Sequence, residues 1–226
     1  VKVSVSSNYN TIVEAMKSKK VDVGFLPPTA YTLAHDQKAA DLLLQAQRYG
    51  VNKDGSNSDK LVKDYKSEIL VKKDSGIKDL KDLKGKKIAL QDVTSTAGYT
   101  FPIATLKEAT GINATKDMKI VNVKGHDQAV ISLLNGDVDA AAVFQDARNI
   151  VKKDQPNVFK DTKIIKLTEP IPNDTISVRP DMDKEFQDKL KKAFKDIAKT
   201  KEGHKIISEV YSHEGYTDAK DSDFVI

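Results

Sequence analysis

Hydrophobic and polar positions alternate along this chain so that helices and strands are predicted in turn. Residues 9–16 carry apolar side chains at helical spacing, and after a polar turn at residues 17–20 the run from Val21 to Phe25 has the pattern of a strand. The run from His126 to Phe144 repeats this order of helix, turn and strand. Matching Val21 with Val138 gives an offset of 117 residues between the copies. The sequence therefore predicts two similar α/β lobes.

The same offset says what the first copy contains. It carries Tyr9 onto His126, and the alternating stretch from Val1 to Val5, which is predicted to be a strand, onto Met118 to Asn122. The second copy is preceded by a further predicted strand and helix, at 87–91 and 99–109, whose counterparts would precede residue 1. We therefore expect the first lobe to lack its opening strand and helix in this chain.

The remaining pattern continues the alternation of strands and helices. The polar segment from Asn52 to Lys60 is predicted to be a loop. Further elements are expected as strands at 42–49, 67–72, 163–167 and 175–178, a short helix at 77–83, and amphipathic helices at 183–199 and 203–211.

The predicted strands at 68–72 and 175–178 flank the second copy, so they are natural places for the chain to cross between lobes. We expect residues 1–76 to form the first part of lobe 1, residues 77–173 lobe 2, and residues 174–226 the return of lobe 1 with the C-terminal helices. This gives a discontinuous first lobe, a continuous second lobe and a cleft between them.

Composition narrows the function classes. The 226 residues are 39% hydrophobic and 31% charged, and no apolar run reaches the roughly 18–20 residues that cross a bilayer. The absence of cysteine excludes disulfides, thiolate metal sites and a cysteine nucleophile. The net charge is only +4, the arginines are Arg48, Arg148 and Arg179, and the lysines are interleaved with acids. This pattern argues against a nucleic-acid partner.

One loop carries the clearest chemical signal. Residues 92–102 leave a buried-type strand and enter a helix, where Pro102 suits only the first turn. Ser95 and Thr96 offer hydroxyls there, and the free N–H groups and dipole of a helix start favour an anion. The alternative is that one hydroxyl merely caps its own helix. The loop has neither the Gly-Lys-Ser/Thr of a nucleotide-binding loop nor the G-x-G-x-x-G of a dinucleotide site.

Four other residues stand where open α/β sheets place ligands. His126 and Tyr9 begin equivalent helices, Asp146 follows a strand, and Asp174 precedes one. Each alone is typical of a capping or surface residue. Ser95, His126 and Asp146 could form a hydrolytic triad on paper, but the G-x-S-x-G elbow is absent. The histidines show no metal-ligand spacing, so neither a metal nor a cofactor is expected.

Taken together, these motifs resemble the phosphate-, phosphite- and phosphonate-binding proteins of ABC transporters. The resemblance covers nearly the whole chain in order, and family members usually begin earlier than Val1 and continue past residues 221–223. The stretches that carry it are residues 9–16 and 21–23, Asp92 through Pro102, Gly125-His126-Asp127 with residues 135–139, and Pro170-Ile171-Pro172-Asn173-Asp174.

The resemblance implies a two-lobed periplasmic-binding-protein fold of type II that closes around one ligand in the interlobe cleft. It implies a monomeric, non-catalytic receptor without cofactor that delivers a phosphorus oxyanion to a membrane permease. The expected location is outside the cytoplasm, either in the periplasm or on a lipid anchor. The alternatives are an effector-binding regulatory domain or an enzyme on the same fold.

The family's ligand contacts carry over by position. The resemblance implies that Ser95, Thr96 and the N–H groups of Ala97 and Gly98 hold the oxyanion. Many members have serine where this chain has Ala97, which removes one hydroxyl donor. The further donors implied are Tyr9, Tyr31, Tyr65 and His126. The positions that match the acids facing a ligand amine in aminoalkylphosphonate binders are Asp146 and Asp174.

These carboxylates are compatible with more than one class of phosphorus ligand. A carboxylate near an anion needs either an ammonium group or a protonated P–OH to meet it. An aminoalkylphosphonate offers the first, and phosphate or phosphite offers the second.

Overall fold

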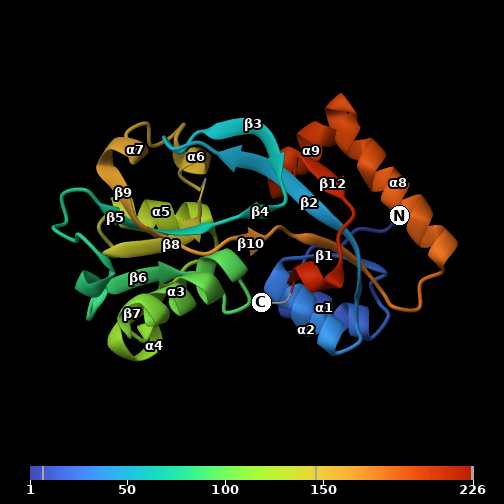
Figure 1. Cartoon of the computed structure of the whole chain (residues 1–226), viewed down its shortest axis with the longest axis horizontal. Helices are drawn as coiled ribbons and strands as arrows, with labels where there is room; N and C mark the ends of the chain where they lie inside the picture. Colours follow the sequence, from blue (N-terminus) through green and yellow to red (C-terminus); the bar gives the residue numbers. More distant parts are fainter. Residues whose placement is uncertain (7, 146, 225–226) are drawn as a thin grey trace. The chain divides into compact units, whose positions relative to one another are not determined.

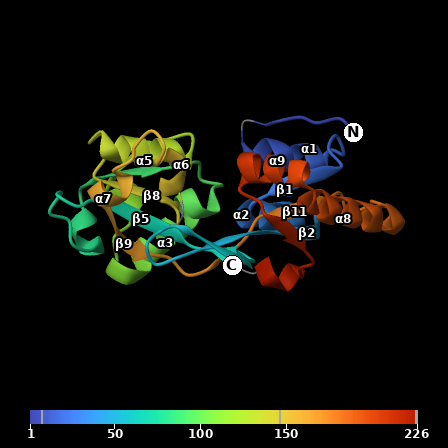
Figure 2. The same cartoon turned by 90° about the horizontal axis from the view of Figure 1, so that it is seen from above.

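The computed structural model describes residues 1–6, 8–145 and 147–224, which form two compact units (Figure 1, Figure 2). Unit 1 comprises Val1–Gly50, Asp59–Asp64 and Pro172–Ile226, and unit 2 comprises Val51–Ser58 and Tyr65–Ile171. The short strands β4 (Asp64–Tyr65) and β10 (Ile171–Pro172) pair with each other where the chain passes between the units. The first unit is therefore discontinuous in sequence and the second is nearly continuous.

Unit 2 is built on a five-stranded sheet in the order β7-β6-β8-β5-β9. Strand β6 pairs in parallel with β7 and β8, and β5 pairs antiparallel with β8 and β9. The strands are β5 (Ser67–Lys72), β6 (Lys87–Leu90), β7 (Lys119–Asn122), β8 (Ala140–Phe144) and β9 (Thr162–Leu167). The helices and turns of this unit are η1 (Leu80–Leu83), η2 (Thr96–Thr100), α3 (Phe101–Thr110), α4 (Ala114–Asp117), α5 (His126–Leu134), α6 (Arg148–Val151) and α7 (Val158–Asp161).

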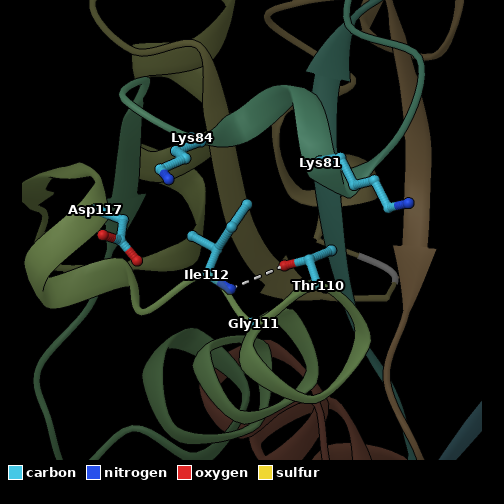
Figure 3. Close-up of a pocket in the computed structure, with 6 residues that line it drawn as sticks. All are labelled: Lys81, Lys84, Thr110, Gly111, Ile112 and Asp117. Atoms are coloured by element: carbon cyan, nitrogen blue, oxygen red, sulfur yellow. Dashed lines mark hydrogen bonds between the residues drawn. The ribbon is translucent and has the colours of Figure 1, made fainter.

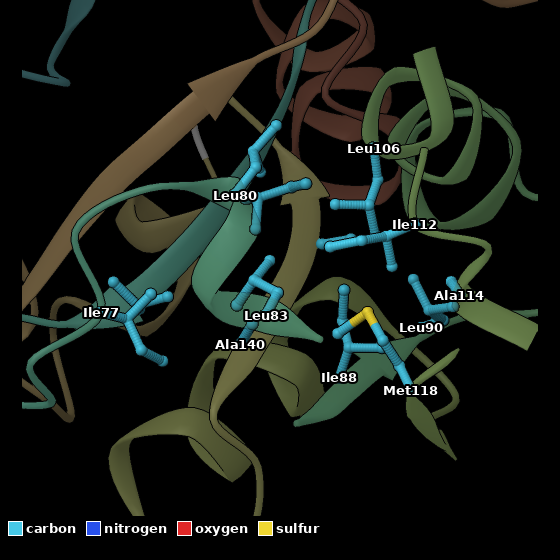
Figure 4. Packing of buried hydrophobic residues seen from close by; sticks show 13 residues of the cluster. Ile77, Leu80, Leu83, Ile88, Leu90, Leu106, Ile112, Ala114, Met118 and Ala140 are labelled. Carbon is cyan, nitrogen blue, oxygen red and sulfur yellow. The ribbon is translucent and has the colours of Figure 1, made fainter. Parts of the chain in front are cut away.

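Both faces of this sheet are buried. Successive side chains of a strand point to opposite faces, so neighbouring residues of one strand enter two different hydrophobic clusters. Ile88 and Leu90 of β6 pack with Leu106 of α3 in one cluster, which Figure 4 shows from close by. Ala89, between them, belongs to the cluster on the other face with Leu133 of α5. The result is a helix–sheet–helix sandwich that fixes the ends of the strands.

Unit 1 also has a five-stranded sheet, in the order β1-β11-β2-β12, with β3 paired to β2. Strand β11 pairs antiparallel with β1 and β2, and β12 pairs antiparallel with β2. Helices α1 and α2 pack with Leu26 of β1 in one cluster, while Phe25 packs in another with Phe194 of α8 and Ile207 of α9. The elements are α1 (Tyr9–Lys17), β1 (Val23–Leu26), α2 (Pro28–Asp36), β2 (Asp41–Val51), β3 (Asn57–Val62), β11 (Thr175–Val178), α8 (Lys184–Lys199), α9 (Lys201–Tyr211), β12 (Gly215–Thr217) and η3 (Asp221–Phe224).

The internal repeat is confirmed in detail. Helix α1 runs from Tyr9 to Lys17 and α5 from His126 to Leu134, so both ends match at the offset of 117 residues. The register matches too, because Phe25 pairs with Ile176 while its counterpart Ala142 pairs with Ile69. Even the irregularities coincide, since β11 shifts register after Ile176 against β2 and β5 shifts after Ile69 against β9.

Two local predictions were wrong. Val1 to Val5 is not a strand: these residues lie outside regular structure, and the valines are exposed. Its counterpart β7 pairs with β6, and among the described residues of unit 1 no strand takes the place of β6. The stretch from Asn52 to Lys60 is a loop only at its start, because β3 begins at Asn57. Among the described residues β3 pairs with β2, and its largely exposed residues show no hydrophobic alternation.

The crossing points also differ from the expected ones. After the short segment Val51–Ser58, the main part of unit 2 begins at Tyr65 rather than at residue 77, because the whole of β5 lies inside the sheet of unit 2 between β8 and β9. It returns to unit 1 at Pro172, two residues before the expected position 174. Strands β5 and β11 are thus inner strands of their own sheets rather than crossing strands.

Candidate functional site

The loop after β6 forms the start of a long helical segment in unit 2. A π-helical turn, η2, leads directly into α3, and Pro102 lies in the first turn of α3 as expected. Ser95 is the N-cap, and its Oγ accepts a hydrogen bond from the Gly98 N–H at 3.2 Å. Thr96, Ala97 and Gly98 are buried. Ser95 therefore caps this segment. Because its oxygen is the acceptor in the bond from Gly98, its hydroxyl can also act as a donor.

Residues of the neighbouring strands bind the backbone of this loop. The Ser67 Oγ lies 2.6 Å from the carbonyl oxygen of Ala97 and 3.0 Å from that of Val143. The Gln91 N–H donates to the Gly98 carbonyl at 3.0 Å, and the Gln91 amide Nε2 donates to Ala142 at 3.2 Å. The carbonyl oxygens of Ala97 and Gly98 are therefore bound by groups of the neighbouring strands, which fixes the backbone of the loop.

His126 is fixed beside the same strand. Its Nδ1 accepts the backbone N–H of Phe144 at 3.1 Å, and the two rings lie 4.3 Å apart between centroids. A ring nitrogen that accepts a hydrogen bond carries no proton, so Nε2 holds the proton and is a donor. The loop and His126 therefore both attach to the carboxyl end of β8, the edge at which open α/β sheets bind ligands.

In unit 1 the structure brings Tyr9 and Asp174 together. Tyr9 is the first residue of α1, which Asn8 caps by accepting the Thr11 N–H at 3.0 Å. Removal of the Tyr9 hydroxyl from water, and then the negative charge of Asp174 and the nearby Tyr211, raise the pKa of Tyr9. Tyr9 therefore keeps its proton and remains a hydrogen-bond donor at physiological pH.

Asp174 is held by residues that sequence reasoning missed. Oδ2 of Asp174 lies 3.2 Å from Nε2 of the buried His213, whose Nδ1 lies 3.1 Å from the hydroxyl of Tyr216. His213 is 39 residues away in the chain, so no spacing rule connects it to Asp174. The available signal was the cluster of aromatic residues around His213 near the end of the chain.

The other predicted residues have different outcomes. Tyr31 is only 1% exposed, and its hydroxyl already donates to Asp221 at 2.7 Å, so the expectation that this donor meets the ligand is corrected. Burial, and next this bond to Asp221, raise the pKa of Tyr31. Tyr65 is half-buried in β4. Asp146 lies outside the described residues.

A separate hollow on unit 2 contains none of these residues. Figure 3 shows it at the far end of α3, lined by Lys81, Lys84, Thr110, Gly111, Ile112 and Asp117. The Ile112 N–H there donates to Oγ1 of Thr110 at 3.2 Å. In the part of the chain that the structure describes, no cluster of three or more His, Asp or Glu side chains is arranged to hold a metal ion.

Comparison with known proteins decides the family. A family model described as "ABC transporter, phosphonate, periplasmic substrate-binding protein" matches residues 1–224. The chain belongs to this family. The family consists of substrate-binding components of transporters, which is not an enzyme family.

Individual relatives agree with the assignment. The chain is 28% identical over 199 residues, 86% of its length and 56% of the relative's, to the "Phosphonates-binding periplasmic protein" of Escherichia coli K12. It is 32% identical over 146 residues, 62% of its length and 43% of the relative's, to the "Phosphate-import protein PhnD" of Mycolicibacterium smegmatis. The chain thus spans about half the length of these two family members.

A solved structure of a family member shows the fold. PhnD1 from Prochlorococcus marinus, in complex with methylphosphonate, matches with a TM-score of 0.77 at 18% identity, covering 99% of this chain and 81% of that one. The predicted fold, that of type II periplasmic binding proteins, is thereby confirmed. None of the described helices is both long enough and apolar enough to span a membrane.

Proposed function

We propose that this protein is the solute-binding receptor of an ABC importer, which captures a phosphonate or a related phosphorus oxyanion and delivers it to the membrane permease. The observation that carries the proposal is the family match over residues 1–224, together with the loop of unit 2 in which hydroxyl and amide groups meet at a helix start. Such a start favours negative charge through its free N–H groups and its dipole.

The phosphoryl oxygens are assigned to the loop of unit 2. Ser95 and Thr96 supply hydroxyls, and the backbone N–H groups around Ala97 and Gly98 supply further donors. All of these donors are neutral, which suits a receptor that must release its ligand as well as bind it. Because residue 97 is alanine, it contributes its N–H but no hydroxyl.

Three further donors are assigned to the ligand. His126 offers Nε2–H, because its Nδ1 is occupied by the N–H of Phe144. Tyr9 offers a hydroxyl whose raised pKa keeps it protonated. Tyr65 completes the set by the family resemblance.

The carboxylates determine which phosphorus compound is preferred. A carboxylate accepts hydrogen bonds but cannot donate them, so Asp174 and Asp146 call for a cationic or protonated group on the ligand. An ammonium group of an aminoalkylphosphonate satisfies both the charge and the hydrogen bonds. The P–OH of monoprotonated phosphate or phosphite satisfies the hydrogen bond only.

The remaining expectations follow from the receptor role. The protein acts as a monomer without cofactor and without catalytic turnover. It works outside the cytoplasm, either free in the periplasm or held at the membrane by a lipid anchor. Its membrane partner is the permease of the importer.

A thermal-shift panel tests the proposal. The ligands are phosphate, phosphite, methylphosphonate and 2-aminoethylphosphonate, with sulfate as the control anion. At about 100 times its dissociation constant, a ligand adds roughly 2.7 kcal/mol to the stability of the folded state, which raises the melting temperature by several degrees. A shift with a phosphorus compound and none with sulfate supports the receptor function. No shift with any of the four, or release of phosphate from a phosphonate, contradicts it.

The variant Asp174→Asn identifies the ligand class. It keeps the size of the side chain and removes its charge. We expect it to weaken 2-aminoethylphosphonate far more than phosphate. An equal loss for both would show that no ammonium group meets Asp174.

A further inference from the structure

His213 connects the carboxylate of Asp174 to the core of unit 1. The residue is 1% exposed, and its ring is stacked on Tyr211 at 5.3 Å and meets the ring of Tyr216 edge-on at 5.6 Å. The ring of Phe25 lies 6.2 Å away. Because aromatic rings pack against it from several directions, the plane of the imidazole is fixed. The contacts of Nδ1 with Tyr216 and of Nε2 with Asp174 determine which way round the ring lies in that plane.

The positions of the protons give a direction to the hydrogen bonds that join Tyr216, His213 and Asp174. The Asp174 carboxylate can only accept, so the Nε2 of His213, 3.2 Å from its Oδ2, must carry a proton. In the neutral form of the ring Nδ1 accepts, and the Tyr216 hydroxyl at 3.1 Å can donate to it. Burial, and then Tyr211 and Asp174, raise the pKa of Tyr216, so that its hydroxyl keeps the proton to donate. In this form the hydrogen bonds run from Tyr216 to His213 and from His213 to Asp174.

The main chain of Asp174 is held independently of its side chain. The Asp174 N–H donates to Oδ1 of the buried Asn173 at 2.9 Å, and the Ala46 N–H donates to the Asp174 carbonyl oxygen at 2.8 Å. These bonds hold the backbone on either side of the residue. The contact with Nε2 of His213 at 3.2 Å acts on the carboxylate itself.

A neutral donor has a particular consequence here. An arginine or lysine in the same place would orient Asp174 but also cancel its charge, so that little attraction for a ligand cation would remain. A neutral imidazole supplies one hydrogen bond and leaves the carboxylate with its full negative charge. The carboxylate is thus oriented and still able to attract an ammonium group.

We propose that His213 is a positioning residue that sets the preference of this receptor for phosphonates bearing an amino group over the same phosphonates without one. The proposal rests on the proposed function, because it assigns His213 the task of orienting Asp174 toward the ligand cation. A residue that only stabilised the fold would affect both kinds of phosphonate alike.

Calorimetric titration of the protein with 2-aminoethylphosphonate and ethylphosphonate separates these roles, because the two ligands differ only in the amine. His213→Phe keeps an aromatic ring in the cluster and removes the donor. We expect it to weaken 2-aminoethylphosphonate at least about tenfold and ethylphosphonate by less than about twofold. His213→Gln, whose amide N–H can reach Asp174, should restore the affinity to within about threefold of the unmodified protein.

The matched control is His204→Gln. His204 lies on the neighbouring helix α9, but its Nε2 contacts Glu214 rather than Asp174, at 2.5 Å. This variant should bind both phosphonates as the unmodified protein does. A loss equal to that of His213→Phe would overturn the specific role of His213.

Nitrogen NMR of the imidazole checks the geometry without ligand. We expect His213 to be the Nε2–H tautomer at neutral pH, and the Nδ1–H tautomer would overturn the proposal. So would equal losses for both phosphonates in His213→Phe, or unchanged affinity for both. If the unmodified protein binds neither phosphonate while the tautomer is as expected, the receptor function itself has failed, and the positioning role falls with it.

Discussion

Replacing Gly98 by alanine places a methyl group where the structure has no room for it. An added Cβ would lie 1.9 Å from Oε1 of Gln91, 2.4 Å from its Cδ and 2.8 Å from Oγ of Ser95. Gln91 is 4% exposed, and its amide donates to the Ala142 carbonyl at 3.2 Å. The amide therefore cannot swing aside without breaking this bond, and otherwise the loop itself must move.

The cost follows from these two routes. Forcing an extra methyl group into a packed region destabilises a protein by about 1–3 kcal/mol. Leaving a buried polar group without its partner costs a similar amount, about 1–3 kcal/mol. We expect Gly98→Ala to lower the melting temperature by roughly 5–10 °C. Because Ser95 to Gly98 must shift, the affinity for the phosphorus oxyanion should fall at least about tenfold, which corresponds to about 1.4 kcal/mol.

A double-mutant cycle with Gln91→Ala tests this reasoning by thermal and chemical denaturation. Gln91→Ala removes the obstructing amide, so the double variant should be more stable than the sum of the two single changes predicts, by about 1 kcal/mol or more. Additive losses would show that the methyl group meets a different obstacle. Gly98→Ala with an unchanged melting temperature and unchanged affinity would refute the described packing of the loop.

Three further substitutions have distinct expected outcomes. Thr96→Val keeps the shape of the side chain and removes its hydroxyl, so oxyanion affinity measured by calorimetry should fall at least about tenfold with little change in melting temperature; unchanged affinity would contradict its role as a ligand. Ser67→Ala leaves the Ala97 carbonyl without its donor and should lower both the melting temperature and the affinity, whereas a loss of stability alone would mean that the loop holds its shape without Ser67. Tyr31→Phe removes the bond to Asp221 and should lower the melting temperature without changing affinity; weaker binding would return Tyr31 to the site.

The sequence predicted the repeated part of the fold well, and the reason is physical. Each copy buries a helix against a strand, and the hydrophobic periodicities of 3.6 and 2 residues record that burial directly. The offset derived from Val21 and Val138 therefore relates α1 to α5 and β1 to β8, although the first helix ends at Lys17, one residue later than its apolar pattern indicated.

The hydrophobic pattern gave wrong predictions for segments in which strand pairing and side-chain burial do not go together. Strand β3 has mostly exposed residues, so no alternation reveals it. The stretch from Val1 to Val5 has the alternation of a strand, but a strand forms only where a partner accepts its backbone hydrogen bonds. The crossing at Tyr65 was missed because the sequence of β5 does not show which strands it pairs with. Only its pairing with β8 and β9 places it inside unit 2.

Site residues with a local sequence signal could be predicted, whereas those defined by contacts between distant parts of the chain could not. The helix start at Ser95 could be predicted because capping residues and Pro102 leave local signals. Tyr31 was misassigned because nothing local shows that its hydroxyl reaches Asp221, 190 residues away. His213 was missed for the same reason, since its role depends on a contact with Asp174 that only the folded chain creates.

Amide NMR of the protein titrated with a phosphonate tests the central claim most directly. The account predicts that the N–H resonances of Ala97 and Gly98 shift strongly as the oxyanion binds. The Ala97 N–H is assigned as a donor to it, and the Gly98 N–H, which donates to Ser95 Oγ at 3.2 Å, lies in the same turn beside the Ser95 hydroxyl. Gly111, at the opposite end of α3 beside the separate hollow, serves as the internal control and should hardly move. Saturable binding that shifts Gly111 and leaves Ala97 and Gly98 unchanged would contradict the account.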